Sequence, residues 1–388
     1  MNWCDTKLGE VLIFKNGKKR PSENGEIPVY GGNGILGFSN QANNENCIVI
    51  GRVGAYCGSV YYEHGKCWVS DNAICAIPKD ANDISFLYYL LKHLELNKKH
   101  IGTSQPLLTQ EILNSIMCKV PERDQQLKIG RVLCCIDEKI ECNKRINENL
   151  EQQAVVLFRS WFSTFSLSPN SPRVNSEFGE IPADFAVVKV GSLPMLVTDY
   201  VANGSFASLK ANVNLYQEPN YAYFIRNTDL KSGIFGVFVD QHSYEFLSKS
   251  TLYGGEIIIS NVGDVGSVFL CPKLDGRMTL GNNIIMLRPE DAHLRYYLYI
   301  WFKYLQGQAL IQGIKGGSAQ PKFNKTDFKN TSVLIPPKDI LTRFHEAVAP
   351  MFEMISQKQI ETAHLADLRD TLLPKLMSGE IDVADLGL

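Results

Sequence analysis

The sequence lacks the features of membrane proteins, secreted proteins and metalloproteins. None of its 388 residues lies in an apolar run of about eighteen or more, as a membrane-spanning helix requires, and its N-terminal segment has no apolar core typical of a secretory signal. Its ten cysteines include no pair or Cys/His group with metal-ligand spacing. We therefore expect a cytoplasmic protein with reduced thiols and no metal site.

Motifs of common enzymes are also missing. The chain has no glycine-rich dinucleotide or P-loop signature, no His-Glu-x-x-His zinc motif, no Gly-x-Ser-x-Gly nucleophile turn and no Asn-Pro-Pro-Tyr motif of DNA amino-methyltransferases. The formal net charge of −2 argues against binding to nucleic acid through a general basic excess. We expect a non-catalytic chain without a cofactor of its own, in which any DNA contact comes from local patches.

What the sequence does contain is a repeat. Four blocks of the first half recur, in the same order, in the second half. The matching pairs are GRVGAYCGSVYY at 51–62 with SNVGDVGSVFL at 260–270, WVSDNAICAIP at 68–78 with MTLGNNIIMLRP at 278–289, FLYYLLKHL at 86–94 with LRYYLYIWF at 294–302, and GTSQPLLTQEIL at 102–113 with GSAQPKFNKTDF at 317–328. The chain is therefore two diverged copies of one unit.

Each copy is predicted to be an α+β domain followed by a long helix. Runs rich in β-branched residues at 47–51 and 256–260 predict buried strands of a curled sheet, and 86–97 and 293–307 predict amphipathic helices. The predicted plan is a first domain at 1–121, a long helix at 122–166, a flexible Ser-, Pro- and Asn-rich linker at 167–180, a second domain at 181–337, and a second long helix with a tail at 338–388.

The two long helices share a heptad pattern at a constant offset of 215 residues, with Leu133 over Val348. Spacings of three and four define an a/d seam and predict that the helices form a coiled coil with each other. The seam residues are Leu133, Ile136, Ile140, Asn143, Asn147, Leu150, Ala154 and Leu157 in the first helix and Val348, Met351, Ile355, Lys358, Thr362, Leu365, Arg369 and Leu372 in the second. Polar residues in the middle of the seam cost stability but can fix register. An antiparallel pair gives the simplest pseudo-twofold arrangement, and the heptads alone leave a parallel pair open.

Basic and glycine-rich loops are the candidate DNA-binding sites. A loop of the first copy combines charges that can reach phosphates with glycine-rich backbone that allows close approach of a ligand. Its candidate residues are Lys15, Lys18, Lys19, Arg20, Tyr30 and Asn33. A solvated charged loop is the alternative interpretation.

Two further pairs of positions match between the copies. Arg52 and Asn261 directly follow the buried strands, and their side chains can contact guanine and adenine in bidentate fashion, or can simply cap a turn. The loops Ser104-Gln105-Pro106 and Ala319-Gln320-Pro321 are either DNA-facing or turns set by proline. The candidates in and beside these loops are Lys98, Lys99, Gln105, Lys315, Gln320 and Lys322.

With these blocks in this doubled order, the chain resembles the specificity subunit of type I restriction-modification systems over essentially its whole length. The resemblance rests on the two VG-to-GSV blocks, the two Gln-Pro loops, LFRSWFSTF at 157–165, LLPKLMSGEI at 372–381 and FGEIPADF at 178–185. The last of these is similar to the segment that opens a recognition domain in this family, although Asp184-Phe185 stands where a Gly-Trp is usual.

The resemblance implies two target-recognition domains separated by an antiparallel coiled coil, each domain reading one half of a bipartite double-stranded DNA site. It also implies two modification subunits, which use S-adenosylmethionine to methylate adenine, and restriction subunits, which use ATP and Mg to cleave DNA. Neither activity belongs to this chain. About 45 helical residues would span roughly 65 Å, or about two turns of B-DNA, so the helix pair would suit a spacer between half-sites.

Two points stay open on the sequence alone. Phe158, Trp161, Phe162 and Phe165, near the end of the first helix, are either a docking surface for the modification subunits or core packing under the adjacent domain. The whole chain is alternatively a protein-interaction scaffold in which the coiled coil only joins two binding domains. A self-sufficient restriction enzyme is a third hypothesis, which the missing methyltransferase motifs argue against.

Overall fold

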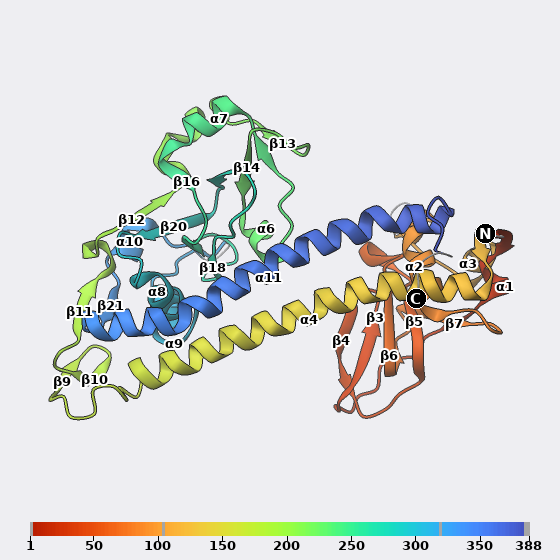
Figure 1. The fold of residues 1–388 in the computed structure, drawn as a ribbon, viewed down its shortest axis with the longest axis horizontal. Helices are drawn as coiled ribbons and strands as arrows, with labels where there is room; N and C mark the ends of the chain where they lie inside the picture. The colour runs from red at the N-terminus through yellow and green to blue at the C-terminus, as the bar shows by residue number, and fades with distance from the viewer. Residues whose placement is uncertain (1–2, 103–104, 318–319, 384–388) are drawn as a thin grey trace. The chain divides into compact units, whose positions relative to one another are not determined.

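Two long helices, α4 (Arg123–Phe162) and α11 (Lys338–Ser378), each contribute to two compact units of the chain (Figure 1). The computed structural model describes residues 3–102, 105–317 and 320–383. The first unit combines Met1–Glu141 with His364–Leu388, and the second is Cys142–Ala363. Both units are α+β, as the repeat predicts.

The first unit is built around a six-stranded sheet. Its strand order is β2 (Leu12–Asn16), β7 (Ala73–Pro78), β5 (Asn44–Gly51), β6 (Val60–Val69), β3 (Ile27–Gly31) and β4 (Gly34–Ser39), and only the β3–β6 pair among these is parallel. The central strand β5 alternates its side chains between two buried clusters, because successive residues of a strand point to opposite faces. Ile48 and Ile50 enter the core that includes Phe86 and Leu90, whereas Val49 lies in a smaller cluster on the other face.

Helices and a second small sheet complete this unit. The helices are α1 (Leu8–Val11), α2 (Ile84–His93) and α3 (Gln110–Ser115), and β1 (Trp3–Lys7) pairs with β8 (Met117–Pro121). The end of the chain also belongs to this core. Leu376, Met377 and Val383 are buried in it, and Gly379 lies so close to Trp3 that an added Cβ would be 2.5 Å from the indole nitrogen. The C-terminal segment therefore helps to close the first unit.

The second unit repeats the central sheet and adds another. Strands β12 (Met195–Asp199), β20 (Ile284–Pro289), β17 (Ile257–Ser260) and β18 (Val268–Leu270) take the places of β2, β7, β5 and β6. The added sheet has the order β13 (Leu215–Tyr216), β15 (Phe238–Val239), β14 (Ala222–Ile225), β19 (Arg277–Leu280) and β16 (Thr251–Leu252). Its β14–β19 pair is parallel, like β3–β6 in the first unit.

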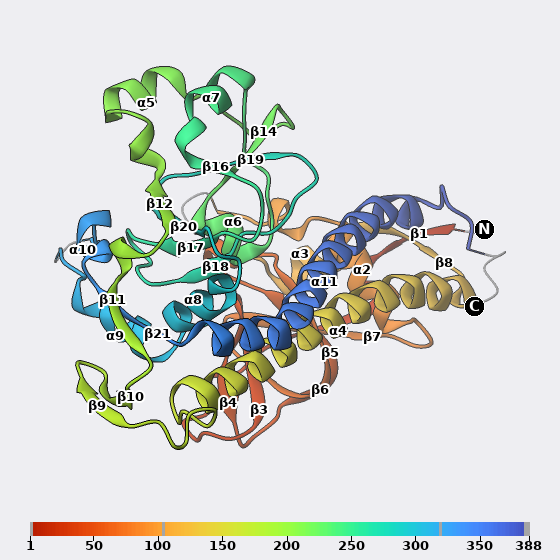
Figure 2. The same ribbon diagram turned by 60° about the vertical axis from the view of Figure 1, so that its left-hand side comes forward.

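The remaining elements of the second unit surround these sheets. Helix α8 (Leu294–Lys303) matches α2, while α5 (Phe206–Asn212), α6 (Asn227–Ser232) and α7 (Gln241–Phe246) belong to an insertion, in which α5 and α7 lie on the side away from α8 (Figures 1 and 2). Helices α9 (Leu305–Gly313) and α10 (Lys325–Lys329) follow, and β11 (Ala186–Lys189) pairs with β21 (Ser332–Ile335) as β1 pairs with β8.

The predicted flexible linker contains regular structure. Strands β9 (Arg173–Ser176) and β10 (Gly179–Pro182) form a hairpin. The Phe178 ring packs edge-on against Trp301, with ring centroids 5.3 Å apart, and Ile181 enters the core of the second unit. Composition alone indicated a loop because these two apolar anchors are few among many polar residues.

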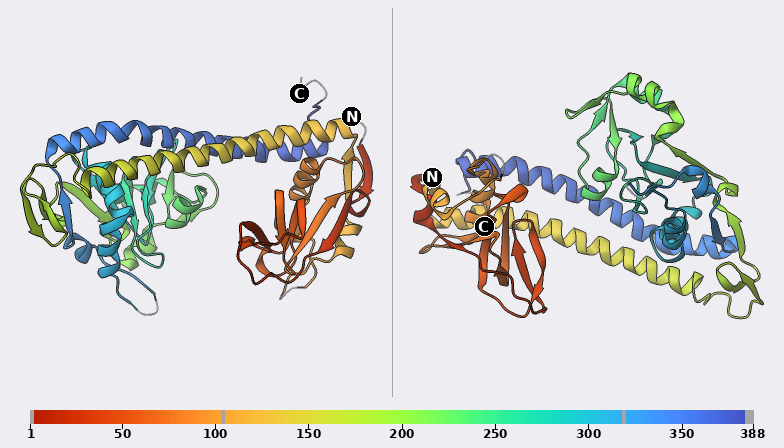
Figure 3. Two further views of the ribbon diagram at one scale, coloured as in Figure 1. Left: turned by 90° about the horizontal axis from the view of Figure 1, so that it is seen from below. Right: turned by 180° about the vertical axis from the view of Figure 1, so that it is seen from behind.

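The long helices pair antiparallel in each unit (Figure 3). In the first unit Arg369 Nη1 contacts Asp137 Oδ1 at 2.7 Å, and in the second unit Asn143 Nδ2 donates to Thr362 Oγ1 at 3.4 Å. Further along, the Arg343 guanidinium lies 5.8 Å from the centroid of the Trp161 ring. Residues further along α4 therefore contact residues that come earlier in α11, which confirms the antiparallel interpretation.

The described seam positions are buried or half-buried, with Leu133, Asn143, Ala154 and Val348 fully buried.

The aromatic residues near the end of α4 are not a docking surface. Phe158 and Phe162 are each 1% exposed, and Trp161 and Phe165 are half-buried against the same cluster. Residues of α8 and α11, which are distant in sequence, pack on Phe158, Trp161 and Phe162, and Phe185 packs edge-on against Phe165.

Candidate nucleic-acid interface

The repeated blocks fold into the same cluster of loops in both units. In the first unit the turn 51–59 lies against residues 101–102 and 105–108, because the Gly54 N–H donates to the Pro106 carbonyl at 3.0 Å. In the second unit the turn 260–267 lies against residues 316–317 and 320–323, where the Gly263 N–H donates to the Pro321 carbonyl at 2.9 Å. We call these the first and second loop clusters. They are equivalent although the domains around them have diverged.

Arg52 and Asn261 hold equivalent backbone positions inside the clusters. Arg52 donates its N–H to Asn72 and accepts from Leu108. Asn261 in the same way donates to Asn283 and accepts from Phe323. The Asn261 amide also donates to the Phe323 carbonyl at 3.3 Å, so this side chain secures the loop and is not free to read a base. The turn-capping interpretation therefore fits Asn261, while Arg52 is half-buried.

Glycines give the two clusters their common path. Gly54 and Gly263 both have φ of +77°, and nothing described lies within 4 Å of a Cβ added to either. Gly102 and Gly317 have φ of +85° and +88°, and an added Cβ would lie 2.7 and 2.6 Å from the carbonyl oxygens of the glutamines three residues later. Only glycine adopts these backbones without strain. The open space at Gly54 and Gly263 leaves room for the backbone of a ligand.

In the first unit several predicted segments converge on the first loop cluster. Lys18 donates its N–H to the Val69 carbonyl at 3.0 Å, and the Ser59 hydroxyl donates to the Gly32 carbonyl at 2.5 Å. These contacts bring the basic loop and the turn that carries Asn33 to the strand ends beside the cluster. The side chains left exposed are Lys15, Lys18, Lys19, Arg20, Asn33, Lys99 and Gln105.

Two predicted DNA contacts do not face solvent freely. Tyr30 is 7% exposed, and its hydroxyl donates to Glu63 at 2.9 Å. Burial, followed by this hydrogen bond, raises the pKa of Tyr30 well above its usual value, so the residue is a neutral packing residue of β3. Lys98 is exposed but its ammonium lies 2.7 Å from the Glu95 carboxylate. The structure therefore does not support a DNA contact for Tyr30, and it gives Lys98 a carboxylate partner.

The second loop cluster also carries exposed candidates. Lys315, Gln320 and Lys322 are exposed within or beside residues 316–317 and 320–323, and the Lys322 backbone pairs with Gly316. Ser104 and Ala319, which open the two Gln-Pro motifs, lie outside the described residues.

Sequence reasoning missed helix α6, which lies against the second loop cluster. Lys231 Nζ is 2.6 Å from Asp264 Oδ2, and the Ser267 hydroxyl donates to the same oxygen at 2.5 Å. The contact with Lys231 is the largest cause that lowers the pKa of Asp264. Because α6 belongs to the insertion, comparison of the two copies contains no signal for it.

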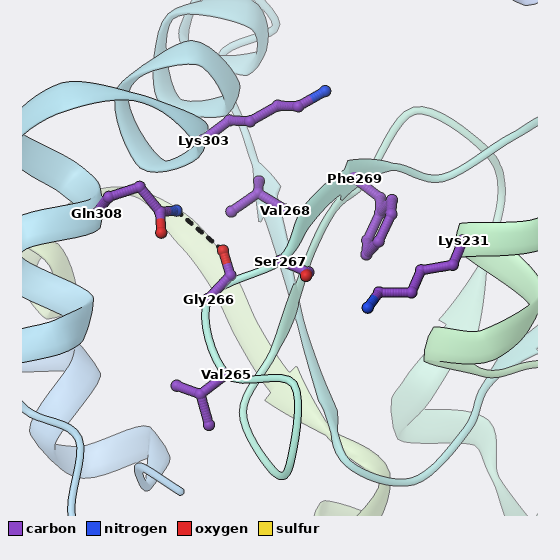
Figure 4. A pocket seen from close by; sticks show the side chains of 8 residues that line it. All are labelled: Lys231, Val265, Gly266, Ser267, Val268, Phe269, Lys303 and Gln308. Carbon is purple, nitrogen blue, oxygen red and sulfur yellow. Dashed lines mark hydrogen bonds between the residues drawn. The ribbon is translucent and has the colours of Figure 1, made fainter. Parts of the chain in front are cut away.

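An open groove of about 480 Å³ lies at this place. Figure 4 shows Lys231 of α6 and Gln308 of α9 on opposite sides of the turn 265–269, with the Gln308 amide donating to the Gly266 carbonyl at 2.9 Å. Lys303 at the rim is paired with Glu151 at 2.6 Å. The two lysines and the hydroxyl that line this groove are already engaged by carboxylates, Lys231 and Ser267 by Asp264 and Lys303 by Glu151.

The described residues contain no group of three or more His, Cys, Asp or Glu side chains placed to hold a metal ion. Within the same residues, no helix combines the length and apolar character needed to cross a membrane.

Comparisons with known proteins agree on one family. Residues 1–152 and 197–363 match the family model described as type I restriction modification DNA specificity domain. The type I restriction enzyme MjaIX specificity subunit of Methanocaldococcus jannaschii is 29% identical over 320 residues, covering 80% of this chain and 72% of the relative. The HindI specificity subunit of Haemophilus influenzae is 24% identical over 378 residues, covering 81% of each chain.

One solved structure supports the fold. The crystal structure of a type I restriction-modification system S subunit from M. genitalium aligns with 97% of this chain and 96% of that chain, at a TM-score of 0.60 and 18% identity.

Proposed function

Because the chain belongs to the family of type I restriction modification DNA specificity domains, we propose that its two units each read one half of a bipartite DNA site. The chain is a non-catalytic specificity subunit. The observation that carries the proposal is the pair of loop clusters, which share their backbone hydrogen bonds but differ in side chains.

The elements around the clusters differ in a way that suits two readers. In the first unit the β3–β4 hairpin and the basic loop lie beside the first loop cluster, whereas α6 lies beside the second. Side chains at base edges specify sequence, while contacts to phosphates only position the protein. A common frame with different flanking elements would thus place each unit on DNA in the same way and read different bases.

The catalytic steps are proposed to lie on other subunits. Two modification subunits would bind S-adenosylmethionine and methylate adenine, and restriction subunits would use ATP and Mg to cleave. The paired helices α4 and α11 would dock the modification subunits and set the spacer between half-sites, because a helix pair resists compression along its axis.

Binding to scrambled DNA sites tests the proposal. Methylome sequencing of the host would first define the bipartite motif. The full-length chain, assembled with its modification subunits, would then be titrated with the motif and with duplexes in which either half is scrambled. We expect either change to weaken binding at least tenfold. Equal affinity for all three duplexes would contradict the proposal and favour a protein-interaction scaffold.

A further inference from the structure

Strand β4, at the edge of the six-stranded sheet, carries apolar side chains that are exposed to solvent. Ile35 is 51% exposed, Leu36 45% and Phe38 51%. Edge strands are usually protected by charge, by short length or by a cover, since unpaired backbone beside apolar side chains invites association. Exposed apolar residues that adjoin one another mark an interaction surface.

The register of the hairpin places these residues together. Ile35 lies opposite Tyr30, and Phe38 lies opposite Pro28, with an irregularity of register between them. Because residues 28 and 30 point to the same face of β3, Ile35 and Phe38 also share a face. The intervening Leu36 folds over Gly31, where an added Cβ would be 2.5 Å from it. Because residues 30 and 31 point to opposite faces of β3, Leu36 lies on the other face, and Ile35 and Phe38 form the apolar surface on the face of Tyr30.

Arg20 fixes a positive charge against this strand. Its Nη1 donates to the Leu36 carbonyl at 3.3 Å, and a Cβ added to Gly37 would lie 2.5 Å from its Nη2. The guanidinium occupies a carbonyl that a further strand would need, which argues against edge-to-edge pairing with a second copy. Lys18 and Lys19 are exposed in the same loop. The acidic Glu23 of this loop accepts a hydrogen bond from Asn40.

The tip of the hairpin lies at the first loop cluster. The Gly32 carbonyl accepts from Ser59, and Asn33 beside it is exposed. The apolar surface thus extends from the loops proposed to face DNA and is flanked by cations that suit phosphates. A two-stranded ribbon fits the major groove of B-DNA, where apolar side chains can contact the methyl group of thymine.

We propose that the β3–β4 hairpin enters the major groove of one half-site, with Ile35 and Phe38 against base edges and Arg20 on the phosphate backbone. This inference rests on the proposed function and identifies the element of the first unit that contacts the bases of its half-site. In the second unit the strand that matches β3 is β14, and α6 follows it in place of a hairpin. The hairpin therefore serves one half-site only.

The test is the double variant Ile35→Ser/Phe38→Ser in the full-length chain, assembled with its modification subunits. Anisotropy titrations would use the methylome-defined duplex and the two half-scrambled duplexes. We expect about a tenfold loss of affinity for the intact site and loss of discrimination at one half, with discrimination at the other half unchanged. Met117→Ser is the matched control, because Met117 is 57% exposed on β8 of the same unit. It should bind like wild type.

A second variant separates phosphate contact from folding. Arg20→Gln should weaken binding to intact and scrambled duplexes alike and lower the slope of log affinity against log salt by about one. Unchanged discrimination in the double variant, at an unchanged melting temperature, would overturn the inference. So would an altered oligomeric state or failure to assemble with the modification subunits, because the surface would then bind protein. If wild type itself distinguished neither half-site, the proposed function would fail instead.

Discussion

Asn143, in the middle of the helix seam, should be replaceable by leucine with a gain in stability. The residue is fully buried in the second unit. Its amide donates to Thr362 at the long distance of 3.4 Å, and its Oδ1 is buried without a hydrogen-bond partner among the described residues. A buried polar atom without a partner is unfavourable, since it has given up its hydration.

The expected gain follows from three contributions. Relief of the unpartnered oxygen is worth about 1–3 kcal/mol, and loss of the Thr362 hydrogen bond costs about 0.5–1.5 kcal/mol. Burial of the leucine side chain adds about 1.5–3 kcal/mol. Part of this gain is lost because the neighbouring side chains of the seam must adjust to a residue of different shape. Thr362 is only half-buried, so its hydroxyl can bond to water. The net gain should be about 2 kcal/mol.

Thermal unfolding of the full-length chain measures this gain. About 2 kcal/mol raises the melting temperature by about 4–8 °C for a unit of 150–250 residues. Asn149→Leu is the control, because Asn149 lies exposed on the same helix and should change stability little. A lower melting temperature for Asn143→Leu than for wild type would refute the reasoning, since the asparagine would then be well satisfied. The variant should also relax the register of the pair.

Three further predictions concern the spacer, a glycine turn and a helix cap. Deletion of seven residues from each long helix should shorten the spacer between the half-sites by about three base pairs, because a helix loses about 1.5 Å of length per residue, or about 10 Å in total. Methylome sequencing of the variant measures the spacer length. An unaltered spacer would contradict the proposed role of the helices. Gly102→Ala should lower the melting temperature more than Gly54→Ala. Both glycines have positive φ, but only at Gly102 would the added Cβ lie 2.7 Å from a carbonyl oxygen. Equal effects of the two substitutions on the melting temperature would show that the loop at Gly102 adjusts. Asp240 accepts from the Ser243 N–H at the start of α7, which lowers the pKa of this carboxyl to about 2. Asp240→Ala should therefore lower the free energy of unfolding by about 1 kcal/mol near neutral pH. The difference in this free energy from wild type, measured by urea unfolding, should shrink as pH falls from about 4 to 2, because protonation of Asp240 in the wild type removes the cap. A difference independent of pH would exclude the charged cap as its origin.

Where the sequence interpretation was wrong, as for Tyr30, or left alternatives open, as for Phe158 and Phe162, the deciding factor is burial by segments distant in the chain. Tyr30 follows a loop rich in Gly and Asn, and composition indicates exposure there. In the structure β3 lies between β4 and β6, and the ring contacts Tyr61 at a centroid distance of 6.1 Å. Phe158 and Phe162 stand near a helix end, yet Tyr297 and Phe344 pack on them. Neither outcome is encoded by local periodicity.

Helix α6 and the apolar hairpin were missed for a different reason. Both lie where the two copies diverge, so comparison of the copies is uninformative there. Their importance comes from position, since Lys231 meets Asp264 and Arg20 meets Leu36 only after the chain folds.

The sequence by itself determined the doubled architecture, the α+β class and the paired helices, because these follow from repeated blocks and from a heptad period that any partner helix must match. The tertiary structure decided the antiparallel pairing, the side chains that remain exposed and the elements that flank each loop cluster. The physical reason is the sequence separation of the interactions that decide each feature. Helix periodicity and glycine turns are local properties, whereas burial and the neighbours of a loop arise from contacts between residues far apart in the chain.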